Sequence, residues 1–287
     1  MERHLIITNE AGESIDLYTD EGIRLVSLDG IGYETSIKSM ELHGQDGALY
    51  QNNQLKPKNI PIVVRYRGPA WKHEQHKNRL AQLIANKQML TIQKVTDNID
   101  VYIKGYAEWV RTPPNVHPMH THISIHCPDP YWKVGGDTTH VISGTEPCFE
   151  FPIEIDEDEG MFFGEIESAL IVPIVNEGTV ESSAIFTFTA VTACSNPRIE
   201  NIDTGEFMQV NVDMVTGDKL VINTKIDDKT IEFTHDGVTE NYFNRRSAGF
   251  TFMYIQPGVN NLKYTVDEGD EHALDITVNF DTQYGGI

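Results

Sequence analysis

Residues 120 to 132 of the chain read HTHISIHCPDPYW, a strand with an abrupt end. From His120 to Cys127 polar and apolar residues alternate, which predicts a β-strand with one solvent-facing side and one core-facing side. Pro128 and Pro130 have no backbone N–H to donate to a neighbouring strand, so the ladder is expected to stop there. The sequence therefore predicts that this strand does not continue past Cys127.

The sequence before this strand predicts a β-sheet domain with one α-helix and a β-hairpin. Between Trp71 and Ala85 there is no Gly or Pro, and Leu80, Leu83 and Ile84 recur at the spacing of one helix face. The apolar stripe is narrow, which favours a helix that lies across a sheet. Strands are predicted at Ile23–Leu28, Ile60–Tyr66, Leu90–Val95 and Val101–Ala107, the last two joined by a turn at Asp97-Asn98.

The sequence after Gly135 and Gly136 changes in character and lacks a helix of convincing length. Short alternating stretches with turns between them predict a β-sandwich or jelly roll. Examples are Ala184–Val191, Phe207–Val212, Lys219–Asn223, Phe250–Ile255 and Ile276–Phe280. We therefore predict two domains, residues 1–138 and residues 139–287, and the sequence leaves open whether Tyr284 to Ile287 pack back on the first.

The net charge of −21 is concentrated in the second of these domains. Residues 1–138 contain 15 Lys and Arg and 16 Asp and Glu, whereas residues 139–287 contain 7 and 27. Affinity for phosphates needs clustered Lys and Arg, so direct binding of nucleic acid or of an anionic membrane is not expected. No apolar run approaches the roughly 20 residues of a membrane span, and no secretory signal is visible, which predicts assembly in a cytoplasm.

The sequence offers no signature of catalysis, and we expect neither an enzyme nor a cofactor. It lacks a nucleophile elbow, an H-E-x-x-H zinc motif and a Walker loop. Carboxylates are so abundant after residue 139 that a pair suited to glycoside hydrolysis carries little weight. The cysteines, Cys127, Cys148 and Cys194, are odd in number and lack C-x-x-C spacing, which favours buried reduced thiols.

A histidine-rich strand face is the main candidate for a metal site, since the acidic run at residues 156–160 is more typical of a solvated loop. His120, His122 and His126 project to one side of the predicted strand, and zinc favours such nitrogen ligands. Polar residues that simply face solvent give the same pattern, and no third ligand from elsewhere is evident. We therefore predict no metal.

Aromatic residues gather in the last third of the chain. They are Phe233, Tyr242, Phe243, Phe250, Phe252, Tyr254, Tyr264, Phe280 and Tyr284. Alternation from Phe250 to Tyr254 predicts three rings on one face of a strand, and we expect most of these rings to be buried. Exposed rings on such a domain would instead suit stacking against sugars.

Several short motifs resemble the distal tail proteins of siphoviruses, the long-tailed phages with non-contractile tails, that infect Gram-positive bacteria. The most specific is CPDPYW at Cys127–Trp132, similar to that family's C-x-D-P-aromatic-W junction. A turn at residues 44–47 (GQDG), ahead of a basic, proline-containing strand entry, also fits. Residues 196–205 (NPRIENIDTG), 217–224 (GDKLVINT) and 256–262 (QPGVNNL) resemble further family stretches, with Asn223 where Asp is commoner. The order and spacing of these motifs along nearly the whole chain carry the resemblance.

The resemblance implies an N-terminal belt domain and a C-terminal galectin-like β-sandwich. Six belt domains would form a homo-hexameric ring at the virion tail tip, which joins the tail tube protein to a tip fibre, a tail-associated lysin or a receptor-binding protein. We expect such a structural hub, with a carbohydrate-binding module that contacts the host cell wall as the alternative. The hairpin Leu90–Ala107 is expected to project and to make ring contacts. The candidate contact residues are Ile103 and Trp109, and a charged residue at either position is expected to give monomers.

Overall fold

The computed structural model of the chain describes residues 3–44, 46–85, 87–113, 119–135, 138–143, 171–269 and 272–287. It contains two compact units, residues 1–135 together with 283–287, and residues 136–282. Gln45 of the predicted turn and Cys148 lie outside the described residues. In the part of the chain that is described, no helix is both long and apolar enough to cross a membrane.

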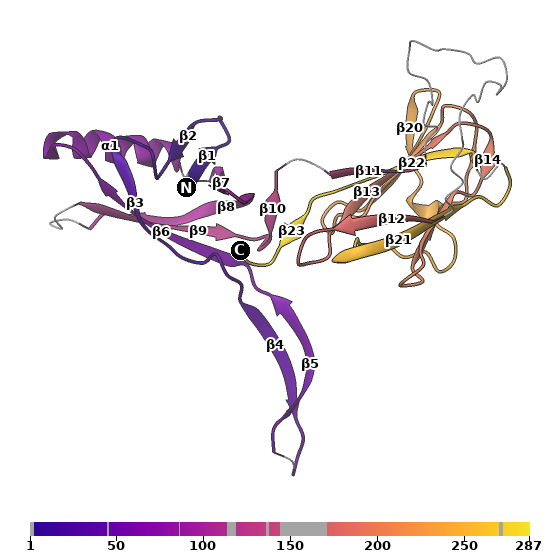
Figure 1. Ribbon diagram of the computed structural model, residues 1–287, viewed down its shortest axis with the longest axis horizontal. Helices are drawn as coiled ribbons and strands as arrows, with labels where there is room; N and C mark the ends of the chain where they lie inside the picture. Colours follow the sequence, from indigo (N-terminus) through magenta and orange to yellow (C-terminus); the bar gives the residue numbers. More distant parts are fainter. Residues whose placement is uncertain are drawn as a thin grey trace, which may run out of the picture. The chain divides into compact units, whose positions relative to one another are not determined.

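The first unit is a mainly antiparallel sheet with one described helix (Figure 1). Its elements are β1 (His4–Asn9), β2 (Ser14–Asp16), β3 (Ile23–Leu28), β4 (Thr35–Glu41), β5 (Ala48–Leu55), β6 (Lys58–Tyr66), α1 (Ala70–Leu83), β7 (Met89–Thr96), β8 (Ile99–Arg111), β9 (His120–Cys127), β10 (Trp132–Val134) and β23 (Gln283–Tyr284). The main sheet has the order β2-β1-β7-β8-β9-β6-β3, with β10 paired to β8 and β23 paired to β10. The strands and the helix predicted for this unit are confirmed.

The helix α1 packs against the sheet through the narrow stripe that the sequence indicated. Leu80, Leu83 and Ile84 are buried in the core of the first unit. Arg79, one turn before Leu83, forms an ion pair of 2.8 Å with Asp20, in the turn that precedes β3. A Cβ atom at Gly22 would lie 2.2 Å from the ring of His76, so a larger residue there would displace this side chain.

The β7–β8 hairpin lies in the middle of the main sheet. Strand β7 pairs with β1 on one side and β8 on the other, while β8 pairs with β7, β9 and β10. Gly105 on β8 is a point of close approach, because a Cβ there would lie 2.6 Å from the carbonyl oxygen of His126. A hairpin paired in this way on both sides does not project, which corrects the expectation drawn from the sequence.

Residues 283–287 belong to the first unit and are held by contacts far apart in the sequence. Tyr284 of β23 pairs with Trp132 of β10, and the Lys58 ammonium donates a 3.0 Å hydrogen bond to the carbonyl of Gly285. Burial lowers the pKa of Lys58 and raises the pKa of the neighbouring Cys127 to about 12. Cys127 is therefore a buried, protonated thiol.

The second unit is a β-sandwich whose two main sheets enclose one core. Its elements are β11 (Thr138–Ser143), β12 (Ile171–Asn176), β13 (Ala184–Ala190), β14 (Cys194–Ser195), β15 (Arg198–Asn201), β16 (Phe207–Gln209), β17 (Asp213–Met214), β18 (Lys219–Asn223), β19 (Thr230–His235), β20 (Val238–Asn241), the 3₁₀ helix η1 (Phe243–Arg245), β21 (Gly258–Thr265) and β22 (Leu274–Phe280). One sheet has the order β11-β22-β13-β18-β19-β20 and the other β12-β21-β15-β16. Cys194 is buried and free, as the cysteine pattern predicted.

The prediction of a strand at Phe250–Ile255 is wrong. Only Ile255 takes part in a β-bridge, with Ser182, and the rest of the segment is irregular. Met253 is buried, whereas Phe250 and Tyr254 are only partly buried. The segment therefore directs its non-aromatic side chains into the core, the reverse of the predicted arrangement.

The motifs shared with the distal tail proteins hold the turns of the second unit. The Asn201 side chain accepts hydrogen bonds from the backbone N–H groups of Asp203 and Thr204, at 3.0 and 3.3 Å. The buried Asn260 side chain donates to the carbonyl of Gln256 at 2.7 Å and accepts from its N–H at 2.9 Å. Side chains that complete backbone hydrogen bonds in this way fix turn geometry. These residues are structural.

Candidate assembly surface

Strands β4 and β5 form a two-stranded sheet of their own, which extends from the first unit (Figure 1). We call this hairpin, residues 35–55, the arm. Nearly all of its described residues are exposed, and only Thr35 and Leu55 at its base are partly buried. An isolated two-stranded hairpin is marginally stable in water, because neither face is covered. The arm thus has the structure of an element that is covered by another molecule.

Both faces of the arm carry exposed apolar side chains. Met40 and Leu49 lie directly opposite each other in the ladder, with 44% and 55% of their surface exposed. Tyr50, 58% exposed, pairs with Ser39 and lies on the other face, together with Ile37, 65% exposed. A contiguous set of exposed apolar side chains marks an interaction surface more often than a solvated one.

The base of the arm is held firmly by the first unit. Gly30 has a φ of +73°, and a Cβ atom there would lie 2.2 Å from the carbonyl oxygen of Asn59. The backbone N–H of Lys56 donates to the carbonyl of Glu34 at 2.9 Å, which closes the hairpin at its root. These contacts pair the arm from its root and hold the segment before β4 against β6.

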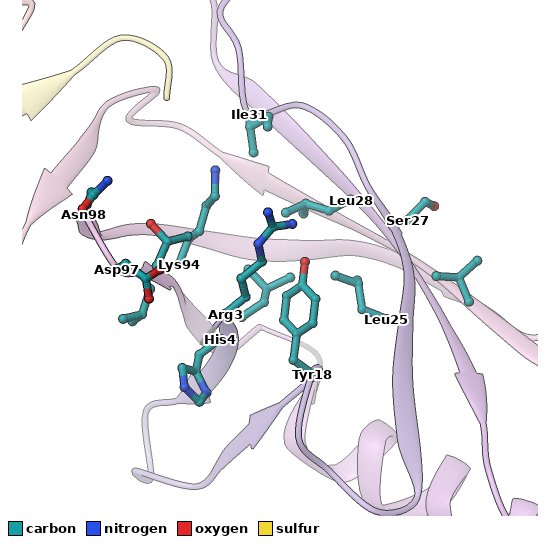
Figure 2. Close-up of a pocket in the computed structure, with 14 residues that line it drawn as sticks. Arg3, His4, Tyr18, Leu25, Ser27, Leu28, Ile31, Lys94, Asp97 and Asn98 are labelled. Atoms are coloured by element: carbon teal, nitrogen blue, oxygen red, sulfur yellow. The ribbon is translucent and has the colours of Figure 1, made fainter. Parts of the chain in front are cut away.

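A cavity of about 690 Å³ opens elsewhere in the first unit, beside strand β3 and the start of β1. Its lining includes the apolar side chains of Leu25, Leu28 and Ile31 (Figure 2). Arg3 and Tyr18 point into the same space, and residues 94–98 of the β7–β8 turn close its other end. The cavity therefore combines an apolar wall with charged groups at its rim.

The edge of the sheet beside this cavity is only partly protected. Strand β3 is the last strand of the main sheet, and its register with β6 shifts between Leu25 and Ser27. Val26 lies at this bulge with half of its surface exposed. Bulges are a common device for limiting pairing at an edge strand, but an apolar residue here leaves a surface that a partner can cover.

One carboxylate organises the chain next to the cavity. Asp16 at the end of β2 lies 2.6 Å from His4 Nδ1 and accepts hydrogen bonds from the Tyr18 N–H and the Thr19 hydroxyl. Burial by itself would raise the pKa of Asp16, but these hydrogen bonds outweigh it and hold the pKa below its ordinary value. The carboxylate is thus ionised and holds Tyr18 at the cavity.

The two residues that the sequence proposed for ring contacts have different environments. Ile103 on β8 is 1% exposed and belongs to the core of the first unit, so its side chain is not available to another subunit in this conformation. Trp109, further along β8, is partly exposed, and the Arg111 guanidinium lies 4.8 Å from its ring centroid. Trp109 stays a candidate contact.

Sequence reasoning missed the arm. Its strands are mostly polar and exposed on both faces, so they lack the alternation that marks a half-buried strand. The available signal was the glycine-rich turn at residues 44–47, with stretches free of Gly and Pro on either side.

The histidine-rich face of β9 has ordinary polar contacts. His126 Nδ1 lies 2.7 Å from the amide oxygen of Asn59, and the Ser124 hydroxyl donates to Glu108 at 2.9 Å. Across the described residues, no group of three or more His, Cys, Asp and Glu is arranged to hold a metal ion.

Residues 177–284 match the family model of the siphovirus-type tail component, C-terminal domain. A search of curated proteins finds no relative. This family match, together with the structural similarities below, confirms the resemblance to siphovirus distal tail proteins noted in the sequence.

Solved structures resemble the whole chain. The SPP1 Dit protein (gp 19.1), described as a paradigm of the hub adsorption apparatus in phages that infect Gram-positive bacteria, is 12% identical over 97% of this chain and 98% of that chain, with a TM-score of 0.68. Chains of the phage P2 baseplate in its activated conformation, with Ca and with Sr, are each 12% identical over 100% of both chains, with a TM-score of 0.53. At this identity the likeness shows the fold, and it confirms the mainly β architecture with a C-terminal sandwich.

Proposed function

We propose that this chain, whose residues 177–284 match the siphovirus-type tail component family, is a structural hub of a phage tail tip or baseplate. In this role it forms a homo-hexameric ring that joins the tail tube protein to the tip fibre, a tail-associated lysin or a receptor-binding protein. It acts as a structural protein of the virion rather than as an enzyme. The arm is the observation that carries the proposal, because it is a fixed element with uncovered apolar residues on both faces.

A closed ring needs two different surfaces on each subunit that complement each other. The arm supplies one of them, with Met40 and Leu49 on one face and Ile37 and Tyr50 on the other. The exposed edge of β3 and the neighbouring cavity supply the second, since Val26 and the cavity wall offer apolar surface of the same unit. We propose that the arm of one subunit packs against the β3 edge of the next, with Trp109 at the border of the contact.

The distribution of charge favours ring contacts through the first unit. Residues 1–135 and 283–287 contain equal numbers of basic and acidic residues, 15 of each, whereas residues 136–282 contain 7 and 28. Six copies of so acidic a surface repel one another if they meet at a shared interface. A neutral first unit avoids this repulsion, so we place the ring contacts there and leave the acidic units to face other components.

The molar mass in solution tests the proposal. Light scattering after size exclusion is expected to give about 194 kDa, six times the 32.4 kDa of one chain. The double variant Met40→Ser/Leu49→Ser removes an apolar cross-strand pair from the arm and is expected to shift the mass to that of the monomer. Val26→Asp, at the proposed receiving surface, is expected to do the same.

A matched control lies on the same hairpin. The double variant Asn52→Ser/Gln54→Ser changes exposed polar residues of the arm and is expected to leave the mass unchanged. The arm is not the contact if Met40→Ser/Leu49→Ser still gives the mass of the wild type. The hub proposal itself fails if the wild-type chain remains at 32.4 kDa both alone and when mixed with the tail tube protein of the same virion.

A further inference from the structure

A cluster of aromatic and basic side chains lies on the second unit. We call it the aromatic–basic surface and define it by the rings of Phe207, Tyr242, Phe243, Phe250, Phe252 and Tyr254 and the cations Arg198, Lys229, Arg245 and Arg246. The Arg246 guanidinium lies 4.1 Å from the ring centroid of Phe243 and 5.9 Å from that of Phe250. Phe252 contacts both of these rings, at 5.9 and 5.0 Å between centroids, and the Lys229 ammonium lies 5.0 Å above it. Phe243, Phe250 and Phe252 with Arg246 and Lys229 thus form one connected group of contacts.

This surface collects most of the positive charge of an acidic unit. Residues 136–282 contain seven Lys and Arg, and four of the seven belong to it. Arg198 pairs with Glu200 at 2.7 Å. Within the described residues no carboxylate lies within ion-pair distance of Lys229, Arg245 or Arg246, all of which are exposed. Although the second unit is rich in carboxylates, these three cations therefore contact aromatic rings and solvent rather than a carboxylate.

A polar hollow opens within the surface. It has a volume of about 250 Å³ and is lined by Asn244, Arg246, Ser247, Gly249 and Phe250. The hydroxyl oxygen of Ser247 is buried and has no hydrogen-bond partner among the described residues. Arg246 Nε donates to the carbonyl of Phe243 at 2.7 Å, which holds the guanidinium in place above its rings. The hollow thus presents a fixed cation and an amide, beside a buried hydroxyl.

We propose that the aromatic–basic surface binds a saccharide that carries a phosphate or carboxylate group. A guanidinium stacked on a ring is pre-organised for bidentate hydrogen bonds to either anion. The exposed amide of Asn244 suits sugar hydroxyls, which both donate and accept. The partly buried ring of Phe250 offers an apolar surface at the rim of the hollow. This role goes beyond that of a structural hub and does not depend on it.

Two other classes of ligand fit the surface less well. The anchor residue of a protein partner usually fills an apolar pocket, whereas this hollow is lined mainly by polar groups. Nucleic acid carries dense negative charge, which the remaining carboxylates of the unit repel. A saccharide with isolated anionic groups is affected less, because charges beyond about 8 Å are screened at physiological ionic strength.

Calorimetric titration of the full chain with defined polymers tests the proposal. The probes are a hyaluronan oligosaccharide, a dextran that carries a phosphate group on one sugar in several, a neutral dextran and poly-glutamate, at matched chain length. Binding is expected to one or both of the anionic saccharides, and the member that binds identifies carboxylate or phosphate as the recognised group. No binding is expected to dextran or to poly-glutamate.

Variants of Arg246 locate the site. Arg246→Gln is expected to weaken binding about tenfold, the effect of one lost charge-assisted hydrogen bond. Arg246→Lys keeps the charge but loses the planar fork, so it should weaken binding by a smaller factor. Lys219→Gln removes the same charge from the same unit outside this surface, and a change below about twofold is expected. Thermal melting of each variant checks that the fold is intact.

Several results would overturn the inference. They are the absence of binding to both anionic saccharides, equal binding of dextran, equal binding of poly-glutamate, and equal weakening by Lys219→Gln and Arg246→Gln. Equal binding of poly-glutamate would indicate an acidic protein segment as the occupant instead.

Discussion

Two hairpins of the first unit, β7–β8 and the arm, have opposite relationships to the main sheet. In the β7–β8 hairpin both strands have partners on each side, and Ile92 and Ile103 face each other in the core. In the arm, strands β4 and β5 pair only with each other, and their apolar residues are exposed. The difference shows that hairpin geometry alone says nothing about role, since one hairpin stabilises the unit and the other presents a surface.

Substitution in the two hairpins should therefore separate stability from assembly. A change in β7–β8 is expected to act on folding, and assembly then fails as a consequence. A change in the arm is expected to act on assembly while the unit stays folded. The expected loss in the free energy of unfolding is largest for substitution of Ile103 in β8 and smallest for substitution of the arm.

Ile103→Asp is expected to unfold the first unit. It replaces a buried apolar side chain by an unpaired charge. The lost apolar burial and the desolvation of the charge together are expected to lower the free energy of unfolding by about 4 kcal/mol or more. Circular dichroism and urea unfolding at 25 °C measure the effect. A variant that stays folded with native stability would show that this position is not in the core, and would return Ile103 to the ring interface.

Gly105→Ala is expected to destabilise the first unit by about 1–3 kcal/mol, as overpacked cores usually do. The added Cβ would lie 2.6 Å from the carbonyl oxygen of His126 and 2.7 Å from Cys127 Sγ, so β8 and β9 must move apart. Urea unfolding provides the measurement. Gly44→Ala, near the tip of the arm where a Cβ meets nothing within 4 Å, controls for the addition of a methyl group, although its φ of +83° adds local strain.

The contribution of Asp16 to stability is expected to disappear in acid. Its folded-state pKa lies below the ordinary value of 3.8, so its hydrogen bonds to His4, Tyr18 and Thr19 stabilise the fold fully above that value. The contribution is lost as the pH falls through the folded-state pKa. The urea midpoint should fall more between pH 6 and pH 3 in the wild type than in Asp16→Asn. An equal fall in the two proteins would show that Asp16 does not contribute in this way.

The arm variant Met40→Ser/Leu49→Ser should change the free energy of unfolding of the monomer by no more than about 0.5 kcal/mol, as is usual for surface positions. Urea unfolding of the dissociated chain checks this. A loss comparable to that of Gly105→Ala would mean that the arm packs on its own unit, and the division between the two hairpins would not hold.

A second contrast lies between predicted and observed aromatic burial. The strand at β13 follows its alternating pattern, with Phe186 and Phe188 buried in the core of the second unit. The stretch from Phe250 to Tyr254 alternates equally well but buries Met253. Alternation states that two faces differ, and it does not state which face is covered. The rings of Phe250 and Phe252 are only partly buried at the margin of the core, with Phe243 and Arg246 beside them.

The sequence by itself determined the strands and turns that bury a face. Alternation located β3, β9 and β18 at their observed bounds, and the narrow stripe of Leu80, Leu83 and Ile84 placed α1 across a sheet. Buried strands are readable because each core-facing position must be apolar, which leaves a period of two in the chain. The charge step between the two halves is likewise a property of composition alone.

Only the tertiary structure decided which elements have partners. The hydrophobic pattern gives no signal for the arm, because nearly all of its side chains are exposed within its own chain. The return of residues 283–287 depends on Lys58 and Trp132, more than 150 residues earlier, and no local pattern encodes such a contact. The aromatic–basic surface likewise unites Arg198, Lys229 and residues 242–254. Local pattern reports that two faces of an element differ, whereas the three-dimensional fold determines which face is covered, what covers it and what stays open for another molecule.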